Sequence, residues 1–250
     1  MGKLIVVGTG IKALSHLTEE TKVVVRESEH CLYLVTEKNI KDWIDGESRS
    51  SESLEHFFDD SKKRKDIYRK ITKYILDEAN KYSSLCVIFY GHPTFFAGSA
   101  LSAVKEHITN KNEAVILPAI SSIDVMWSDL CIDPGSEGCC IFEATDFLIK
   151  KRIFDTRSHL ALMQVGVIGG DDLFLRENSG ILQTYLEKHY PEIHQLIIYE
   201  APFIPGEKPH IEKIHLSELS ESALSKVGMV QKQPVLLNKR HTQSCPIMLS

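Results

Sequence analysis

The sequence predicts an α/β protein, in which short buried strands alternate with amphipathic helices. Three apolar runs that are rich in β-branched residues have the length of buried strands: Lys3–Val7, Leu85–Phe89 and Ala114–Leu117. Each run leads into a turn that contains glycine, proline or other small residues. In open α/β sheets, ligands bind at the edge formed by the carboxyl ends of the strands. Functional residues are therefore expected directly after these runs.

The composition excludes several classes of protein. Of the 250 residues, 43% are apolar and 25% are charged, which is typical of a globular protein with one large or two modest domains. The net charge of −5 gives no general attraction to nucleic acid or to an anionic membrane. No stretch approaches about 18 uninterrupted apolar residues, and the six cysteines show no C-x-x-C spacing. We expect a cytoplasmic protein with no metal site and no nucleic-acid or membrane partner.

The first predicted strand leads into Gly8-Thr-Gly-Ile-Lys-Ala13, which matches the G-x-G-x-x-A turn of dinucleotide-binding folds, with Glu27 or Glu29 as the later acidic residue. Such a turn opens directly into a helix, whereas a polar break follows here. In the competing interpretation, Thr18 is the N-cap of a separate helix that continues to about residue 30. The second strand is then Cys31–Val35. We prefer this interpretation to the dinucleotide site.

The next part of the chain is predicted to form a short helix over 37–44, a polar surface loop over Asp45–Ser53 and then a longer helix. Apolar residues recur at helical spacing from Ile67 to Ala79. The basic cluster at the start of this helix is typical of a solvated first turn and is too short for a nucleic-acid surface. Arg64 and Tyr68 are four residues apart, so they share one helix face and can act on one ligand.

Tyr90-Gly-His-Pro93 follows the strand Leu85–Phe89, so Tyr90 and His92 are expected in a turn at the ligand-binding edge of the sheet. The simpler alternative is that this motif only makes a turn. A similar arrangement follows the strand Ala114–Leu117, where Pro118-Ala-Ile-Ser-Ser122 precedes a helix. Serine hydroxyls and backbone N–H groups at a helix start can hold a carboxylate or hydroxyl group of a ligand.

The second half of the chain is also predicted to contain both strands and helices. Its expected strands are Cys139–Ala144, Leu160–Val165 and Leu196–Tyr199, with a helix over 179–189. Gln164 is a polar side chain in an otherwise apolar strand, so either the fold or a ligand must supply its hydrogen-bond partners. The last segment, 231–250, has little core-forming potential and is interpreted as a tail.

Several motifs together resemble those of the tetrapyrrole methylase superfamily, whose members are S-adenosylmethionine (SAM) methyltransferases. The matching blocks are Tyr90-Gly-His-Pro93, Pro118–Ser122 with Asp129–Pro134, Phe142–Asp146 and Gln164-Val-Gly166. Within the superfamily, the chain is most similar to the borosin enzymes, which methylate backbone amide nitrogens of a peptide. Arg64-Lys-Asp-Ile-Tyr68 carries this finer likeness, because it resembles the catalytic pair of borosin enzymes.

The resemblance implies a fold of two α/β domains, each a mixed sheet with flanking helices, and SAM in the cleft between them. We expect an N-terminal domain over 1–117 on the substrate and catalytic side, and a C-terminal domain over 118–230 on the SAM side. The tail over 231–250 is of uncertain structure. A homodimer is implied by the resemblance alone.

The resemblance also implies roles for individual residues. The residues expected to bind the cofactor are Tyr90, His92, Phe95, Ala97, Ser121, Ser122 and Gln164. The catalytic group would be Arg64, Tyr68 and Tyr90. An amide nitrogen must lose its proton before it can attack, and a tyrosinate beside an arginine could take that proton. Either tyrosine could be this base, with Arg64 as its electrostatic partner.

These observations favour a SAM-dependent methyltransferase that acts on backbone amides of a separate precursor peptide. In a variant of this hypothesis, the segment Pro234–Ser250 is itself the substrate. The alternatives are a methylase of a tetrapyrrole or another small molecule, and a SAM-binding interaction module without turnover.

Overall fold

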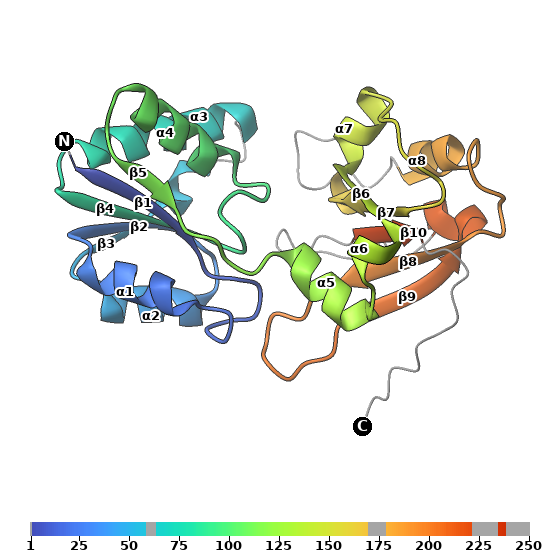
Figure 1. The fold of residues 1–250 in the computed structure, drawn as a ribbon, viewed down its shortest axis with the longest axis horizontal. Helices are drawn as coiled ribbons and strands as arrows, with labels where there is room; N and C mark the ends of the chain where they lie inside the picture. The colour runs from blue at the N-terminus through green and yellow to red at the C-terminus, as the bar shows by residue number, and fades with distance from the viewer. Residues whose placement is uncertain (1, 59–63, 170–178, 222–234, 239–250) are drawn as a thin grey trace. The chain divides into compact units, whose positions relative to one another are not determined.

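The computed structural model describes residues 2–58, 64–169, 179–221 and 235–238, and the chain forms two compact units. The first unit comprises Met1–Val125 and Phe203–Glu207, and the second comprises Met126–Pro202 and Lys208–Ser250 (Figure 1). The sequence placed the domain boundary between residues 117 and 118. In the structure the boundary falls within a helix, α5 (Ser122–Leu130), and a later segment returns to the first unit. Neither feature leaves a change of composition that a sequence could reveal.

The first unit contains one five-stranded sheet with helices on both faces. Its elements are β1 (Lys3–Gly8), α1 (Glu19–Glu27), β2 (His30–Leu34), α2 (Lys38–Glu47), β3 (Ser51–Ser53), η1 (Leu54–Phe57), α3 (Arg64–Ala79), β4 (Ser84–Phe89), α4 (Gly98–Thr109) and β5 (Ala114–Ile116). The strand order is β3-β2-β4-β1-β5, and every pair in this sheet is parallel. The prediction of a mixed sheet was therefore wrong for this unit. Helical crossovers between successive strands make them parallel.

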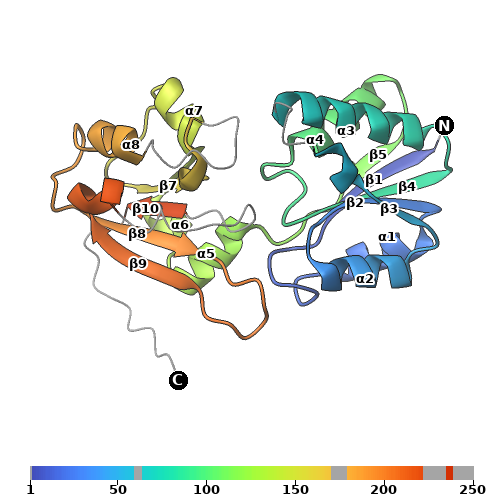
Figure 2. The same ribbon diagram turned by 180° about the vertical axis from the view of Figure 1, so that it is seen from behind.

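The two helical layers explain the apolar patterns of the sequence. Figures 1 and 2 show α3 and α4 on one face of the sheet and α1 and α2 on the other. Ile71 and Ile75 of α3 are fully buried in the first layer, and Ile40 and Ile44 of α2 are fully buried in the second. The predicted helix over 67–79 and the predicted N-cap are confirmed, because the Thr18 side chain accepts a hydrogen bond from the N–H of Thr21.

The predicted loop over 45–53 was wrong. Helix α2 continues to Glu47, and Ser51–Ser53 forms the edge strand β3, which pairs in parallel with β2. The side chains of this strand are polar and half-buried, so neither apolar alternation nor β propensity indicates a strand there. Short polar strands are common at sheet edges because they discourage further pairing.

The second unit has a mixed sheet of order β6-β7-β10-β8-β9. Its elements after α5 are α6 (Pro134–Glu137), β6 (Cys139–Glu143), α7 (Ala144–Ile149), β7 (His159–Met163), η2 (Val165–Val167), α8 (Ser179–Leu186), β8 (Gln195–Glu200), β9 (His210–His215), η3 (Leu216–Glu221) and β10 (Val235–Asn238). Among the strands that the structure describes in this unit, only β6 and β7 pair in parallel. The interpretation of 231–250 as a tail was wrong for 235–238, because β10 lies between β7 and β8. The rest of that segment lies outside the described residues.

Candidate functional site

The carboxyl edge of the first sheet gathers most of the predicted site residues. Because the strands are parallel, the loops that follow β1, β4 and β5 all leave from the same edge. The loop after β4 carries four of the predicted residues, and the loop after β5 leads to two more at the start of α5. These residues are Tyr90, His92, Phe95, Ala97, Ser121 and Ser122. The topology thus brings six predicted residues to one edge.

Glycines allow the backbones at this edge to approach closely. Gly10 and Gly91 exchange two main-chain hydrogen bonds of 3.2 and 3.1 Å, and both have positive φ angles, 70° and 71°. A Cβ atom on Gly8 would lie 2.1 Å from the carbonyl oxygen of Gly91 and 2.8 Å from the Cβ of Ala119. Only glycine fits at Gly8, because the loops after β4 and β5 both pack against it.

Some loops at strand ends are also held in a strained conformation. Leu14 after β1, Phe96 after β4 and Gln164 after β7 have left-handed φ angles of 57°, 59° and 60°. Lys111, Cys131 and Lys151 also have positive φ, but each lies within two residues of a helix C-terminus, where this conformation is common. Leu14, Phe96 and Gln164 do not follow a helix C-terminus, so a C-cap does not account for their conformation, and Gln164 is instead the N-cap residue of η2. Strain of this kind concentrates at functional sites.

Tyr90 is half-buried and its hydroxyl donates a hydrogen bond of 3.2 Å to the carbonyl of Ile11. Its ring centroid lies 6.4 Å from that of Phe203, in the segment that returns to this unit. Burial raises the pKa of the Tyr90 phenol well above its ordinary value, and the Glu37 carboxylate raises it further. Both effects favour the protonated phenol, which is the form that donates the hydrogen bond to Ile11.

The other side chains of the loop after β4 make local contacts. The Nδ1 atom of His92 lies 3.2 Å from the N–H of Thr94 and 3.0 Å from its hydroxyl. The rings of Phe95 and Phe96 meet edge to face, with centroids 4.5 Å apart. Ala97 is the N-cap residue of α4 and packs against the core on the α3 side of the sheet. These contacts fix the shape of the loop and leave the ring of Phe95 half-buried.

Ser121 has a structural role that the sequence analysis did not foresee. Its N–H and its hydroxyl both donate to the Asp124 carboxylate, at 2.7 and 2.6 Å, and the N–H of Asp124 donates to its hydroxyl oxygen at 3.3 Å. This reciprocal arrangement is a capping box at the start of α5. Ser121 is only 7% exposed, and its hydroxyl is already engaged in the helix cap. A ligand would therefore meet the half-buried Ser122 and the N–H groups of this turn more readily than the Ser121 hydroxyl.

Tyr68 lies in the first two turns of α3, and α3 packs against α4. The Thr72 hydroxyl, one turn further along α3, donates to the carbonyls of Tyr68 at 2.9 Å and of Ser99 at 3.3 Å. Ser99 is in the first turn of α4, directly after the loop that starts with Tyr90. This contact brings the helix that carries Tyr68 beside that loop. The side chain of Arg64 lies outside the described part of the chain, so its pairing with Tyr68 stays a prediction.

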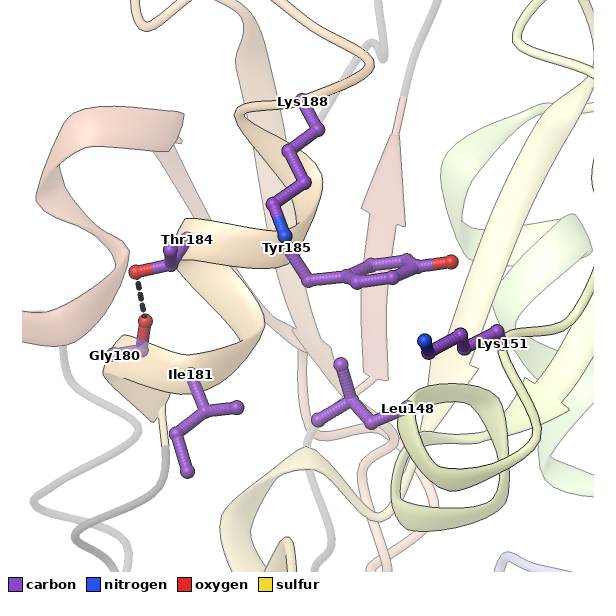
Figure 3. Close-up of a pocket in the computed structure, with 7 residues that line it drawn as sticks. All are labelled: Leu148, Lys151, Gly180, Ile181, Thr184, Tyr185 and Lys188. Carbon is purple, nitrogen blue, oxygen red and sulfur yellow. Dashed lines mark hydrogen bonds between the residues drawn. The ribbon is translucent and has the colours of Figure 1, made fainter.

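Gln164 belongs to the second unit, and it lies at the end of β7 instead of inside the strand as predicted, because β7 ends at Met163. Its side chain is half-buried. A pocket of about 640 Å³ also lies in this unit, between α7 and α8 (Figure 3). Its lining residues are Leu148, Lys151, Gly180, Ile181, Thr184, Tyr185 and Lys188. No predicted site residue lines this pocket.

Glu37 is a further residue at this edge that was not predicted from the sequence. This residue follows β2 at the same edge, and its carboxylate acts electrostatically on Tyr90. It could have been predicted, because Glu37 follows the predicted strand Cys31–Val35 and ligands bind after the carboxyl ends of parallel strands. Among the described residues, no group of three or more histidine, cysteine or acidic side chains could hold a metal ion. The described helices include none that is long and apolar enough to cross a membrane.

Comparison with known proteins gives concordant matches. The family model of the tetrapyrrole (corrin/porphyrin) methylases matches residues 3–201. The methyltransferase/cyclic peptide precursor of lentinulin A from Lentinula edodes is 33% identical over 224 residues, which cover 88% of this chain and 54% of that protein. The corresponding omphalotin A precursor protein from Omphalotus olearius is 30% identical over 229 residues, covering 90% and 55%. The chain thus spans about half the length of the curated relatives it matches.

Solved structures share the fold. Uroporphyrin-III C-methyltransferase from Thermus thermophilus superposes with a TM-score of 0.65 at 14% identity, over 94% of this chain and 91% of that one. A structure of the same kind of enzyme in complex with S-adenosylhomocysteine gives a TM-score of 0.63 at 17% identity, over 94% and 96%. At these identities the likeness concerns the fold alone.

Proposed function

Because the chain belongs to the tetrapyrrole (corrin/porphyrin) methylase family, we propose that it uses SAM to methylate backbone amide nitrogens of a peptide. The observation that carries this proposal is the 30–33% identity, over 88–90% of the chain, to proteins named as methyltransferase and cyclic peptide precursor. The uroporphyrin enzymes share only 14–17% identity with it. A peptide is therefore favoured over a tetrapyrrole as the substrate.

The residues at the carboxyl edge of the first sheet fit a ligand such as SAM. A buried carboxylate oxygen of Glu37 at this edge has no hydrogen-bond partner among the described residues, so a ligand can supply one. In this proposal SAM, when bound, supplies an electrophilic methyl group. The cofactor would be held at this edge by Tyr90, His92, Phe95, Ala97 and Ser122, together with the turn at Ser121 that caps α5. Gln164, a residue of the second unit, would also bind the cofactor.

Tyr68 is the proposed base. A base must accept the amide proton, and Tyr90 is a poor candidate because its phenol is stabilised in the protonated form. Tyr90 would instead donate a hydrogen bond and orient the reacting groups. The Arg64 guanidinium, four residues before Tyr68 on α3, would favour the Tyr68 phenolate and balance charge on the amide oxygen. The main task of the protein is then to align the amide nitrogen with the methyl group.

Co-expression with a short peptide encoded beside the gene tests this function. The intact mass of the peptide should rise by whole methyl groups with the wild-type protein, and Tyr68→Phe and Arg64→Ala should abolish the rise. Tyr82→Phe is the matched control, because the Tyr82 ring stacks on His30 at 4.6 Å, away from the carboxyl edge. A wild-type protein that adds no methyl group, or variants that methylate normally, would contradict the proposal.

Three finer proposals rest on the resemblance to borosin enzymes. A homodimer would be tested by light scattering of the purified protein, where a fully active monomer would contradict it. A peptide substrate on a separate chain, as opposed to the segment 234–250, would be tested by the intact mass of the protein expressed alone. Extra methyl mass on the protein itself would favour that segment. A cytoplasmic location would be tested by cell fractionation.

A further inference from the structure

Glu37 occupies the ligand-binding edge of the first sheet but has no assigned role. Strand β2 pairs in parallel with β4, and Leu34 lies opposite Phe89 at their last register position. The residues that follow the two strands, Glu37 and Tyr90 among them, therefore leave from the same edge. Glu37 is the N-cap residue of α2, yet its side chain makes no capping hydrogen bond. The side chain is therefore not used to cap its own helix.

One oxygen of the Glu37 carboxylate lacks a hydrogen-bond partner among the described residues. Its Oε2 atom is buried, and no described residue donates a hydrogen bond to it. Lys41, one turn along α2, forms an ion pair of 2.6 Å with Glu55. Burial raises the pKa of Glu37, against opposing effects of the backbone N–H groups of Glu37 and Thr36, the Thr36 side chain and Lys41. These donors leave the buried Oε2 atom without a partner in the described part of the chain. Buried carboxylate oxygens normally accept a hydrogen bond or face a cation, so a ligand can supply the missing partner.

The position of the carboxylate indicates which part of a ligand it meets. Glu37 follows β2 and Tyr90 follows the neighbouring strand β4 at the same edge. Burial raises the pKa of the Tyr90 phenol, and the Glu37 carboxylate adds to this effect. Under the proposed function, Tyr90 is the side chain beside the methyl group that is transferred. A negative charge near that point acts on the sulfonium, which carries the positive charge of SAM.

We propose that Glu37 is a specificity-determining residue for the cofactor, whose carboxylate faces the positive sulfonium and so favours SAM over S-adenosylhomocysteine. This inference rests on the proposed function. Transfer of the methyl group converts the sulfonium into a neutral thioether, so the attraction to Glu37 ends when the reaction is complete. The carboxylate would thus help the protein release its product and rebind the methyl donor.

Isothermal titration calorimetry at pH 8, far above the ordinary pKa of a glutamate, tests this role on the full chain. Wild type and Glu37→Gln are each titrated with SAM and with S-adenosylhomocysteine. The variant should bind SAM about tenfold more weakly, as expected for the loss of one charge within several ångströms of the sulfonium. Its affinity for S-adenosylhomocysteine should change less than about twofold. The ratio of the two dissociation constants is the decisive readout, and it does not depend on turnover.

Asp42→Asn is the matched control, because it removes the same charge from the same helix at a side chain that is 61% exposed and paired with Lys38. It should leave both affinities unchanged. Equal losses for both ligands in Glu37→Gln would place the carboxylate at the amino group or ribose and overturn the inference, as would an unchanged affinity for SAM. If the wild type binds neither ligand, the proposed function itself fails. Thermal melts establish that both variants are folded.

Discussion

The hydroxyl of Tyr90 donates a hydrogen bond of 3.2 Å to the main-chain carbonyl of Ile11, across 79 positions of sequence. This contact links the loop after β4 to the loop after β1, next to the two hydrogen bonds between Gly10 and Gly91. Donation to a carbonyl uses the proton of the phenol, so this contact favours the protonated form. The same hydroxyl therefore holds two loops of the ligand-binding edge together.

Tyr90→Phe should separate these two roles. The loss of the hydrogen bond should cost about 1 kcal/mol of the free energy of unfolding, because the ring still packs and only the hydroxyl is lost. Methyl transfer should fall by at least about tenfold, since a positioning donor is removed, while the affinity for SAM changes by less than about threefold. Chemical denaturation, calorimetry and the mass assay measure the three quantities. Equal losses in binding and transfer would show that the role of Tyr90 is misassigned.

Gly8→Ala should destabilise the first unit by about 3 kcal/mol, because its Cβ would lie 2.1 Å from the carbonyl oxygen of Gly91. Gly46→Ala is the matched control. No heavy atom lies within 4 Å of a Cβ at that position, and Gly46 is in helix α2. There alanine should stabilise by up to about 1 kcal/mol. Urea denaturation measures both, and a neutral Gly8→Ala would mean that the strand ends are not packed as described.

Glu37→Gln should stabilise the protein at neutral pH. A carboxyl whose pKa is raised in the folded state binds its proton more tightly there than in the unfolded chain. The wild type therefore loses stability as pH rises from the ordinary pKa of glutamate through the raised value, whereas the glutamine variant does not. The difference in melting temperature should be positive at pH 7 to 8 and should shrink on acidification below the ordinary pKa. A variant that is less stable than wild type at neutral pH would contradict the unpartnered carboxylate.

Leu237→Pro should destabilise the second unit, because β10 pairs with β7 on one side and β8 on the other. Proline removes a backbone donor from a central strand, at a cost of about 3 kcal/mol. Ile153→Pro is the control, since Ile153 is 95% exposed in a connecting segment. Limited proteolysis and urea denaturation report the loss. If both variants were equally stable, 235–238 would not be a central strand.

Much of the fold could be predicted from the sequence, because its elements are locally encoded. The strands before the glycine and proline turns, the N-cap at Thr18 and the apolar face of Ile67–Ala79 each depend on neighbouring residues. The elements that were missed are short or polar. Strand β3 has three polar residues at a sheet edge, and β10 lies far along the chain from both of its partners.

The sequence by itself determined the α/β class and the set of residues at strand ends, including Tyr90 and His92. Tertiary structure alone decided the environment of those residues. It engages the Ser121 hydroxyl in a helix cap, raises the pKa of the Tyr90 phenol and leaves a carboxylate oxygen of Glu37 without a donor among the described residues. The physical reason is that helical and strand patterns arise from neighbours in sequence. Burial, charge and hydrogen-bond partners instead depend on segments that fold together from distant positions.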